Sequence, residues 1–400
     1  MKNNHKKNTT QVSGLSPQPL PSGLSPQPLP SGLSPQPSIR ILTLVSDAFG
    51  GHGGIATFNR GFLSAIAAME DVTEVRVLPR LVERDEPCPE NIVQVNSAAG
   101  GKGTYLKALL NTLADNTFDL ILCGHINLLP FARLAQLRCR CPLSLVVHGI
   151  DVDQAASRFG LRFLAQRADH LISVSDLTRQ LFLEWAPLKH GQTSILPNCV
   201  DLERFTPGPK SDELLDRYDL CDKQVLMTFG RLAGRDREKG FDEVLEVLPE
   251  LRKSWSNLAY LVIGDGPDRK RLEAKAQSLG VSESVVFTGR ISEAEKVDHY
   301  RLADLYVMPS RGEGFGIVIL EALACGIPVI GSKVDGTREA LLDGQLGELV
   351  DPDKPAELID AIERGLQKGE KGRPEGVGVF SVESFNERVR EVFLGLRTET

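Results

Sequence analysis

The segment from Leu305 to Ile330 reads LYVMPSRGEGFGIVILEALACGIPVI, and its pattern indicates the fold. A short apolar run, Leu305 to Met308, has the length and composition of a buried strand and stops at Pro309. A polar, glycine-rich turn follows, after which Gly316 to Ala324 reads as a helix closed by a glycine. Pro328 to Ile330 begins the next strand. The segment therefore predicts a strand–loop–helix–strand unit whose loop lies at the carboxyl end of a parallel strand, where open α/β sheets bind ligands.

Two carboxylates stand in this unit, Glu313 in the loop and Glu321 further along the helix. A helix N-terminus supplies unpaired N–H groups and the positive end of a dipole. A carboxylate can accept two hydrogen bonds at once, which suits the vicinal hydroxyls of a sugar or a ribose. The alternative is a solvated helix face on which the negative charge is mildly favourable. Spacing alone leaves both interpretations open.

The residue types in this segment are more informative than the spacing of the two glutamates alone. Glu313, seven residues and Glu321, with GEGFG before and EALACGIPVI after, resemble the donor-site signature of retaining GT-B glycosyltransferases, family four in particular. The resemblance covers about residues 39–396 and is strongest from Asn198 to Asp353. It implies two Rossmann-like parallel-sheet domains facing each other across a cleft. It also implies contacts between the nucleotide-sugar donor and the residues that follow Glu313, namely Gly314, Phe315, Gly316 and Ile317.

Composition limits the class of protein. The 400 residues are 41% hydrophobic and 25% charged, as in a folded protein, and the net charge of −7 argues against a nucleic-acid partner. No apolar run is long enough for a transmembrane helix, and no secretory signal is present, so we expect a cytoplasmic protein. The seven scattered cysteines fit a reducing compartment; for Cys139 and Cys141 we expect packing, with metal ligation as the alternative.

The chain divides into five parts. Residues 1–38 contain the repeat SGLSPQPLP, whose proline density excludes a packed core and predicts a disordered tail. The tail is a spacer, a ligand for a proline-binding module or a tolerated low-complexity segment. Alternating strands and helices predict one Rossmann-like domain over 39–197 and another over 210–380, joined by a hinge at 198–209. By the resemblance, the first domain holds the acceptor, the second the donor, and a last helix within 381–400 crosses back to the first.

The first domain carries two candidate loops. The strand from Ile39 is followed by GGHGG and a helix, which is the arrangement that brings backbone N–H groups to a phosphate, although it is not the dinucleotide fingerprint. The resemblance places Gly53 and Gly54 near the donor. His148 follows the predicted strand Leu143 to Val147; it is either a hydrogen-bonded strand end or, by the resemblance, the catalytic histidine. Asp151 and Asp153 spell a metal–diphosphate motif of another fold, which we discount.

A basic stretch in this domain has two interpretations. Arg158, Arg162 and Arg167 accompany an amphipathic segment from Leu161 to Asp169. They form a solvated face, or they contact an anionic lipid surface or an acceptor phosphate. Peripheral contact with the inner face of a membrane therefore stays open.

The second domain begins with a strand that ends in Gly230, Arg231 and Leu232, and Lys239 stands at the next helix start. An arginine and a lysine beside helix N–H groups can clamp a diphosphate, or they can pair with the acids nearby. The resemblance assigns Arg231 and Lys239 to the diphosphate, although Arg235 and Arg237 compete with Arg231. It also places Gly264, Arg290 and Ile291 at the donor.

We therefore expect a retaining glycosyltransferase that needs no metal or other cofactor. In this interpretation Arg231 and Lys239 stabilise the leaving diphosphate, and Glu321 holds the ribose. Glu313 holds the transferred sugar without acting as a nucleophile, and His148 steadies the sugar or the acceptor. The donor would be a GDP- or UDP-sugar, and the acceptor a glycan, a lipid-linked glycan or a small molecule. The alternatives are a sugar-nucleotide epimerase or hydrolase, and a non-catalytic subunit that binds nucleotide sugars.

Overall fold

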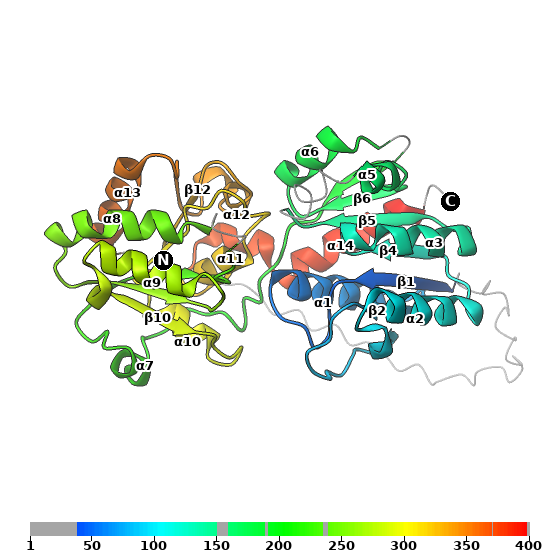
Figure 1. Cartoon of the computed structure of the whole chain (residues 1–400), viewed down its shortest axis with the longest axis horizontal. Helices are drawn as coiled ribbons and strands as arrows, with labels where there is room; N and C mark the ends of the chain where they lie inside the picture. The colour runs from blue at the N-terminus through cyan, green and yellow to red at the C-terminus, as the bar shows by residue number, and fades with distance from the viewer. Residues whose placement is uncertain (1–37, 150–158, 189–190, 235–238, 370, 398–400) are drawn as a thin grey trace, which may run out of the picture. The chain divides into compact units, whose positions relative to one another are not determined.

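The computed structural model describes residues 38–149, 159–188, 191–234, 239–369 and 371–397 (Figure 1). Within these ranges the strands form two sheets in which every paired strand is parallel. The seven-stranded sheet has the order β3-β2-β1-β4-β5-β6-β7, and the six-stranded sheet has the order β10-β9-β8-β11-β12-β13. The predicted pair of Rossmann-like sheets is confirmed. The exact domain bounds remain a prediction.

The strands of the first sheet are β1 (Ile39–Val45), β2 (Val72–Pro79), β3 (Ile92–Gln94), β4 (Leu120–Cys123), β5 (Leu143–Val147), β6 (His170–Ser173) and β7 (Gln192–Ile195). The strands of the second are β8 (Gln224–Phe229), β9 (Leu258–Ile263), β10 (Val285–Gly289), β11 (Leu305–Val307), β12 (Val329–Ser332) and β13 (Glu348–Val350).

The helices that accompany the first sheet are α1 (Gly54–Ala67), α2 (Lys102–Ala114), α3 (Leu129–Cys139), α5 (Phe159–Ala165) and α6 (Asp176–Trp185). Those that follow are α7 (Asp212–Arg217), α8 (Phe241–Ser254), α9 (Arg269–Ser278), α10 (Lys296–Leu302), α11 (Ile317–Ala324), α12 (Thr337–Ala340), α13 (Pro355–Lys368) and α14 (Val382–Arg397). None of the described helices is long and apolar enough to cross a membrane.

Side chains alternate across the central strand β1, as the period of a strand requires. Ile41 and Val45 belong to the core shared with α1 and α14, whereas Leu42 and Leu44 belong to the core under α2 and α3. Both faces are therefore covered, which explains why apolar residues of β1 point to both sides of the sheet. The last helix α14 packs on α1, where the rings of Phe58 and Phe385 lie 5.9 Å apart.

The segment predicted as a hinge is well packed. Phe205 is 4% exposed and lies in the same core as residues of both sheets. Arg373 donates hydrogen bonds to the carbonyl oxygens of Leu202 and Phe205 at 2.8 and 2.6 Å, and Val200 N donates to Phe380 O at 2.9 Å. Side-chain and backbone bonds thus fix the path of this segment.

Two strands were not predicted from the sequence, and one helix ends earlier than its predicted segment. β3 and β7 are short edge strands, three and four residues long, that are too brief to show a period. The helix expected from Leu161 to Asp169 is α5, which ends at Ala165, so that Arg167 lies in the turn before β6. The seven cysteines form no disulfide, and Cys139 and Cys141 pack against the core under α3.

Removal of residues 1–38 should leave the fold and the donor site intact. The core clusters of the described chain begin at Ile39, and Ser38, the one described residue that the deletion removes, makes an exposed hydroxyl contact with Thr73 at 3.0 Å. We expect the melting temperature of residues 39–400 to lie within about 2 °C of the full chain, since exposed contacts contribute little to stability. Loss of a cooperative transition in scanning calorimetry would contradict this expectation.

Candidate active site

The predicted site residues follow strands at the two points where strand order reverses. In the first sheet the order reverses between β1 and β4, and in the second between β8 and β11. Gly53 and Gly54 follow β1, Gly230 follows β8, and Glu313 follows β11. Ligands of open α/β sheets bind outside the carboxyl ends of strands at such switch points. Topology thus gathers residues from distant parts of the sequence at the expected edge of each sheet.

A buried aspartate shapes the Glu313 loop. Asp335 is 4% exposed and its Oδ2 accepts hydrogen bonds from Ser310 Oγ at 2.6 Å and from Glu313 N at 2.9 Å. Its Oδ1 accepts from the amide and the hydroxyl of Thr337 at 3.1 and 2.7 Å. Burial raises the pKa of the Asp335 carboxyl, although these hydrogen bonds act in the opposite direction. The carboxylate thus joins the loop after β11 to the loop after β12.

Lys239 and Glu313 form an ion pair in the structure. Lys239 Nζ donates to Glu313 Oε2, and both side chains are about one-fifth exposed, at 19% and 18%. The pair places a cation and a carboxylate side by side at the carboxyl ends of β8 and β11. These are the groups that a diphosphate and a neighbouring sugar hydroxyl would each require.

Glu321 lies deeper in the same half. It is 4% exposed on α11, and its two carboxylate oxygens accept hydrogen bonds from Lys296 Nζ and Tyr300 Oη, each at 2.6 Å. A buried charge requires such partners, because an unpaired carboxylate would lose its hydration without compensation. The solvated-face alternative is therefore wrong for Glu321.

Three glycines bring the loops around Glu313 into backbone contact with one another. A Cβ on Gly314 would meet the carbonyl oxygen of His148 at 1.9 Å, and a Cβ on Gly336 would meet that of Gly314 at 2.1 Å. Gly149, with φ of 120°, faces Gly314 from the other side. A side chain at Gly149 or Gly314 would separate the His148 loop from the Glu313 loop, and one at Gly336 would separate the Glu313 loop from the loop after β12.

Two further contacts connect the same parts. Gly54, at the start of α1, lies 3.7 Å from the Cδ1 atom of Ile317 when measured from the Cβ position it lacks. The Glu339 carboxylate accepts hydrogen bonds from the amides of Asp176 and Leu177 at the start of α6, at 2.8 and 2.9 Å. A carboxylate is favourable there because it meets the positive end of the helix dipole.

His148 is a neutral base in this environment. Its Nε2–H donates to Gly124 O at 3.1 Å, and its ring lies edge-on to Phe58 with centroids 5.1 Å apart. Burial, together with the nearby His125, lowers the pKa of His148 to about 4. The ring is therefore uncharged at neutral pH.

The remaining predicted residues differ in what they can offer. Arg231 and Arg290 are exposed, and Ile291 is half-buried. Gly264 is buried against Gly230 O, from which its missing Cβ would be 1.9 Å away. Phe315 is 1% exposed and packs on Phe380, so its side chain belongs to the core and only its backbone can reach a ligand. Asp151, Asp153, Arg158, Arg235 and Arg237 lie outside the described residues.

Sequence reasoning missed three residues of this site, namely Asp335, Lys296 and Tyr300. Asp335 lies in the segment VDGTRE after β12, whose sequence gives no sign that the carboxylate is buried. Lys296 and Tyr300 lie on the seven-residue helix α10, which is too short to show helical periodicity.

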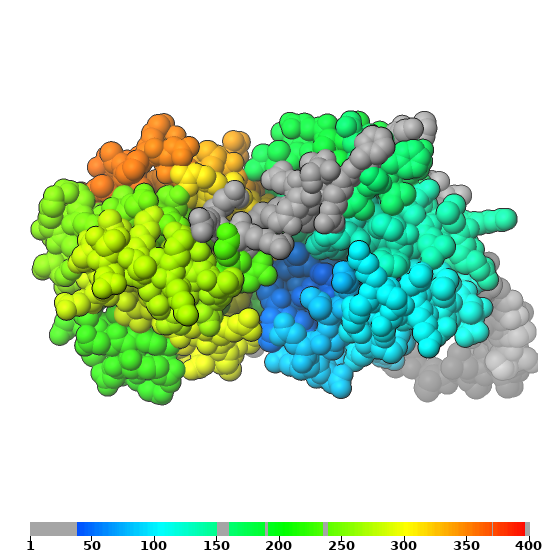
Figure 2. Space-filling view, in the orientation of Figure 1, coloured from blue at the N-terminus to red at the C-terminus, as the bar shows by residue number. Residues whose placement is uncertain are grey.

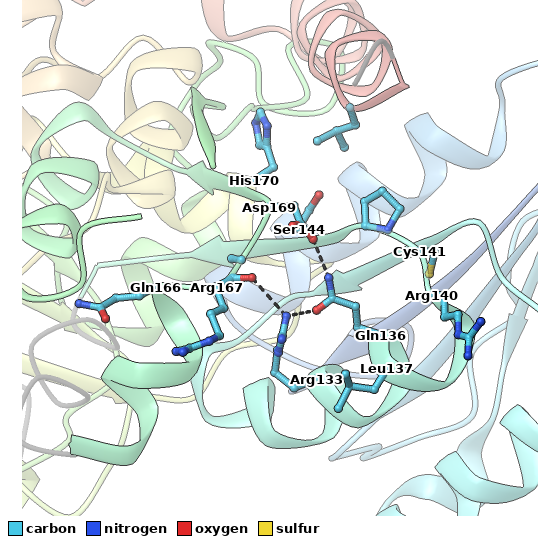
Figure 3. A pocket seen from close by; sticks show the side chains of 13 residues that line it. Arg133, Gln136, Leu137, Arg140, Cys141, Ser144, Gln166, Arg167, Asp169 and His170 are labelled. Carbon is cyan, nitrogen blue, oxygen red and sulfur yellow. Dashed lines mark hydrogen bonds between the residues drawn. The ribbon is translucent and has the colours of Figure 1, made fainter. Parts of the chain in front are cut away.

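A separate hollow lies at the opposite edge of the first sheet. It encloses about 960 Å³ and is lined by residues from α3 and from the starts of β5 and β6, including Arg133, Arg140, Ser144 and His170 (Figure 3). Arg133 donates to Gln136 and, at 3.2 Å, to Arg167 O. Because β5 is parallel to its neighbours, this hollow lies at its amino end, whereas His148 follows its carboxyl end. The hollow is therefore not part of the site.

Replacement of Asp335 by asparagine should loosen the Glu313 loop. An amide nitrogen cannot accept the bonds that one carboxylate oxygen receives from its donors. We expect a loss of about 1–3 kcal/mol in the free energy of unfolding, measured by urea denaturation. The exposed helix residue Asp360 gives the matched control, since Asp360→Asn should change stability by less than about 0.5 kcal/mol. Equal effects of the two changes would contradict the role given to Asp335.

Two half-buried histidines, His125 and His148, should make the fold sensitive to acid. Burial lowers the pKa of His125 and of His148 from 6.5 to about 4. Below pH 6.5 the unfolded chain binds protons that the folded chain refuses, so stability should fall between pH 6.5 and 4. Imidazole NMR signals of both residues should stay neutral from about pH 8 to 5.5. A midpoint near 6.5 for His148, as in free histidine, would overturn this assignment.

Comparison with known proteins identifies the family to which the chain belongs. The model for Glycosyltransferase Family 4 matches residues 53–204, and the model for Glycosyl transferases group 1 matches residues 221–373. Anabaena Alr3699/HepE, solved in complex with UDP-glucose, has a TM-score of 0.71 at 22% identity and covers 89% of this chain and 100% of its own. Such a likeness shows the GT-B fold alone.

Curated relatives are more similar in sequence. A GDP-mannose-dependent alpha-(1-6)-phosphatidylinositol monomannoside mannosyltransferase of Mycolicibacterium smegmatis is 37% identical over 240 residues, 56% of this chain and 61% of that protein. A D-inositol 3-phosphate glycosyltransferase of Geodermatophilus obscurus is 31% identical over 267 residues, 64% of this chain and 58% of that protein. The match thus spans about three-fifths of each relative. With both halves matched and the paired sheets in place, the chain belongs to glycosyltransferase family 4.

Proposed function

We propose that this chain is a retaining, metal-independent glycosyltransferase that uses a nucleoside diphosphate sugar, with GDP-mannose as the first candidate donor. One observation carries the proposal. The Glu313 carboxylate, which pairs with Lys239, and the buried Glu321 carboxylate belong to the loop after β11 and to the following helix α11, where the strand order of the second sheet reverses. A nucleoside diphosphate sugar needs a cation for its phosphates and hydrogen-bond acceptors for its ribose and sugar hydroxyls, and this edge offers all three.

The chemistry follows from where charge develops. When the bond between the sugar and the diphosphate breaks, negative charge grows on the leaving phosphate oxygen. Lys239, with Arg231 beside it in the loop after β8, would stabilise that charge more strongly in the transition state than before it. Two cations can do what a metal does elsewhere, so the proposal requires no metal. Within the described ranges no three His, Cys, Asp or Glu side chains cluster as metal ligands.

His148 and Glu313 would act on the transferred sugar. Their loops meet through the backbone of Gly314, which leaves no room for a side chain between them. A neutral imidazole and a carboxylate can both accept hydrogen bonds from sugar hydroxyls and orient the ring. Retention of configuration means that the acceptor approaches on the face from which the diphosphate leaves. His148 would then steady the sugar or the acceptor, and Glu313 would hold the sugar without bonding to it.

The relatives guide the choice of substrates. One is named for GDP-mannose and phosphatidylinositol monomannoside, another for D-inositol 3-phosphate. We therefore infer an acceptor that carries an inositol phosphate or a related glycan, free or linked to a lipid. Helices α2 and α3, cyan to teal in Figure 2, expose apolar and basic side chains of the kind that suits an anionic membrane surface, which supports the lipid form. Leu110 and Leu137 are 50% and 69% exposed, and Lys107 and Arg138 are exposed as well.

Nucleotide binding gives the first test. GDP should raise the melting temperature of the full chain in the presence of EDTA, because a ligand that binds the folded state stabilises it by mass action. Lys239→Ala should weaken GDP binding by about 10- to 100-fold, the value of a hydrogen bond to a charged group. Lys253→Ala, on the exposed face of α8, is the matched control and should leave binding unchanged.

Product analysis then distinguishes the reactions. With GDP-mannose and a phosphatidylinositol acceptor, we expect mannosyl lipid and little free mannose. Free mannose without acceptor would favour a hydrolase, and a changed nucleotide sugar would favour an epimerase. Glu313→Gln should lower turnover more than affinity, whereas Glu321→Gln should chiefly weaken donor binding. If no GDP or UDP compound binds, the transferase proposal is wrong.

A further inference from the structure

The Glu321 carboxylate is held by two residues of one short helix. Lys296 and Tyr300 are four positions apart on α10, so their side chains lie on the same face. Lys296 Nζ donates to Glu321 Oε1 and Tyr300 Oη donates to Oε2, each over 2.6 Å. With one donor on each oxygen, the plane of the carboxylate is fixed in space.

The two donors leave the carboxylate able to bind a ligand. An ionised carboxylate has about four lone-pair positions, of which Lys296 and Tyr300 use one on each oxygen. The Glu321 side chain is 5% exposed, so a ligand can approach it only along a narrow front. The remaining lone pairs, one on each oxygen, match two hydroxyls on adjacent carbons. The cis-diol of a ribose has this form.

Lys296 and Tyr300 are themselves held firmly. Tyr300 is fully buried, with its ring 5.8 Å from that of Phe229 and 6.1 Å from that of Phe205. The Lys296 ammonium lies 5.3 Å from the Phe229 ring centroid and 5.8 Å from that of Phe205. Burial and the Glu321 charge raise the pKa of Tyr300 well above 10, so its hydroxyl remains a donor. Neither side chain can turn away from Glu321 without leaving its packing.

The network continues into the segment between the two sheets. Lys296 Nζ lies 3.9 Å from Glu293 Oε1, and Glu293 in turn pairs with Arg204 at 3.1 Å. Arg204 precedes Phe205, whose ring packs on Tyr300. The position of the Glu321 carboxylate thus depends on two residues of the connecting segment.

We propose that Lys296 and Tyr300 are positioning residues that orient Glu321 to accept both ribose hydroxyls of the donor, so that the site selects ribonucleotides over deoxyribonucleotides. This inference rests on the proposed function, which already places the ribose at Glu321, and deepens it by naming the two residues that orient this carboxylate. A purely structural role for the two residues would instead give equal losses with every nucleotide.

The test compares GDP with 2′,3′-dideoxy-GDP, and UDP with its dideoxy form, by calorimetric titration of the full chain. Wild type should bind the ribonucleotide about 10- to 100-fold more tightly, the effect of charge-assisted hydrogen bonds. Tyr300→Phe keeps the ring and Lys296→Met keeps the aliphatic stem. Each should weaken ribonucleotide binding by about 5- to 30-fold and change dideoxynucleotide binding by less than about twofold.

Controls separate the possible failures. Lys253→Met removes an exposed lysine and should keep full discrimination, and Lys296→Arg should restore most of what Lys296→Met loses. If wild type binds both forms equally, or if the variants weaken both equally, the positioning proposal is wrong while the proposed function stands. If neither GDP nor UDP binds wild type, the proposed function fails and this inference fails with it.

Discussion

The Asp335 carboxylate is the contact on which the rest of the site depends. It is buried, and its two oxygens accept hydrogen bonds from the loops that follow β11 and β12. The loop it holds carries Glu313 and Gly314, and Gly314 presses against the backbone of His148. Asp335 therefore fixes the relative positions of the Glu313 carboxylate and the neutral His148 imidazole, although Asp335 itself does not have to contact a ligand. The burial that raises its pKa also makes its hydrogen bonds costly to lose.

Glycine placement imposes a second constraint of the same kind. Gly149, Gly314 and Gly336 stack so closely that a methyl group at any one would overlap a neighbouring backbone atom. Polar loops usually keep their distance through side chains, but here the backbones themselves are in contact. Gly149 and Gly314 allow the His148 loop of the first sheet to contact the Glu313 loop of the second, and Gly336 allows the loop after β12 to contact the same Glu313 loop. This close contact explains why the central position of the GEGFG motif, Gly314, is a glycine.

Much of this was predictable from the sequence, because the informative residues follow strands with strong apolar patterns. The strand before Glu313, the strand before His148 and the helix after Gly54 all lie where their patterns place them. The short elements were not predictable: α10, β3 and β7 show no period within so few residues. Contacts between sequence-distant side chains, such as Lys296 with Glu321, were equally hidden, because no local pattern records a partner 25 positions away. The burial of Phe315 was hidden as well, since the side chain of a residue inside the predicted donor-site motif belongs to the core.

The position of the nucleotide site is tested most directly by hydrogen–deuterium exchange of the full chain with and without saturating GDP in EDTA. We expect slower amide exchange in the loops that follow β1, β8, β10 and β11, and in α10. One ligand at the switch points would contact these segments or reduce their local opening. Exchange around the hollow lined by Arg133, Arg140 and His170 should not change. Protection confined to that hollow, at the amino end of β5, would show that the nucleotide binds at the opposite edge of the sheet and would contradict the site described here.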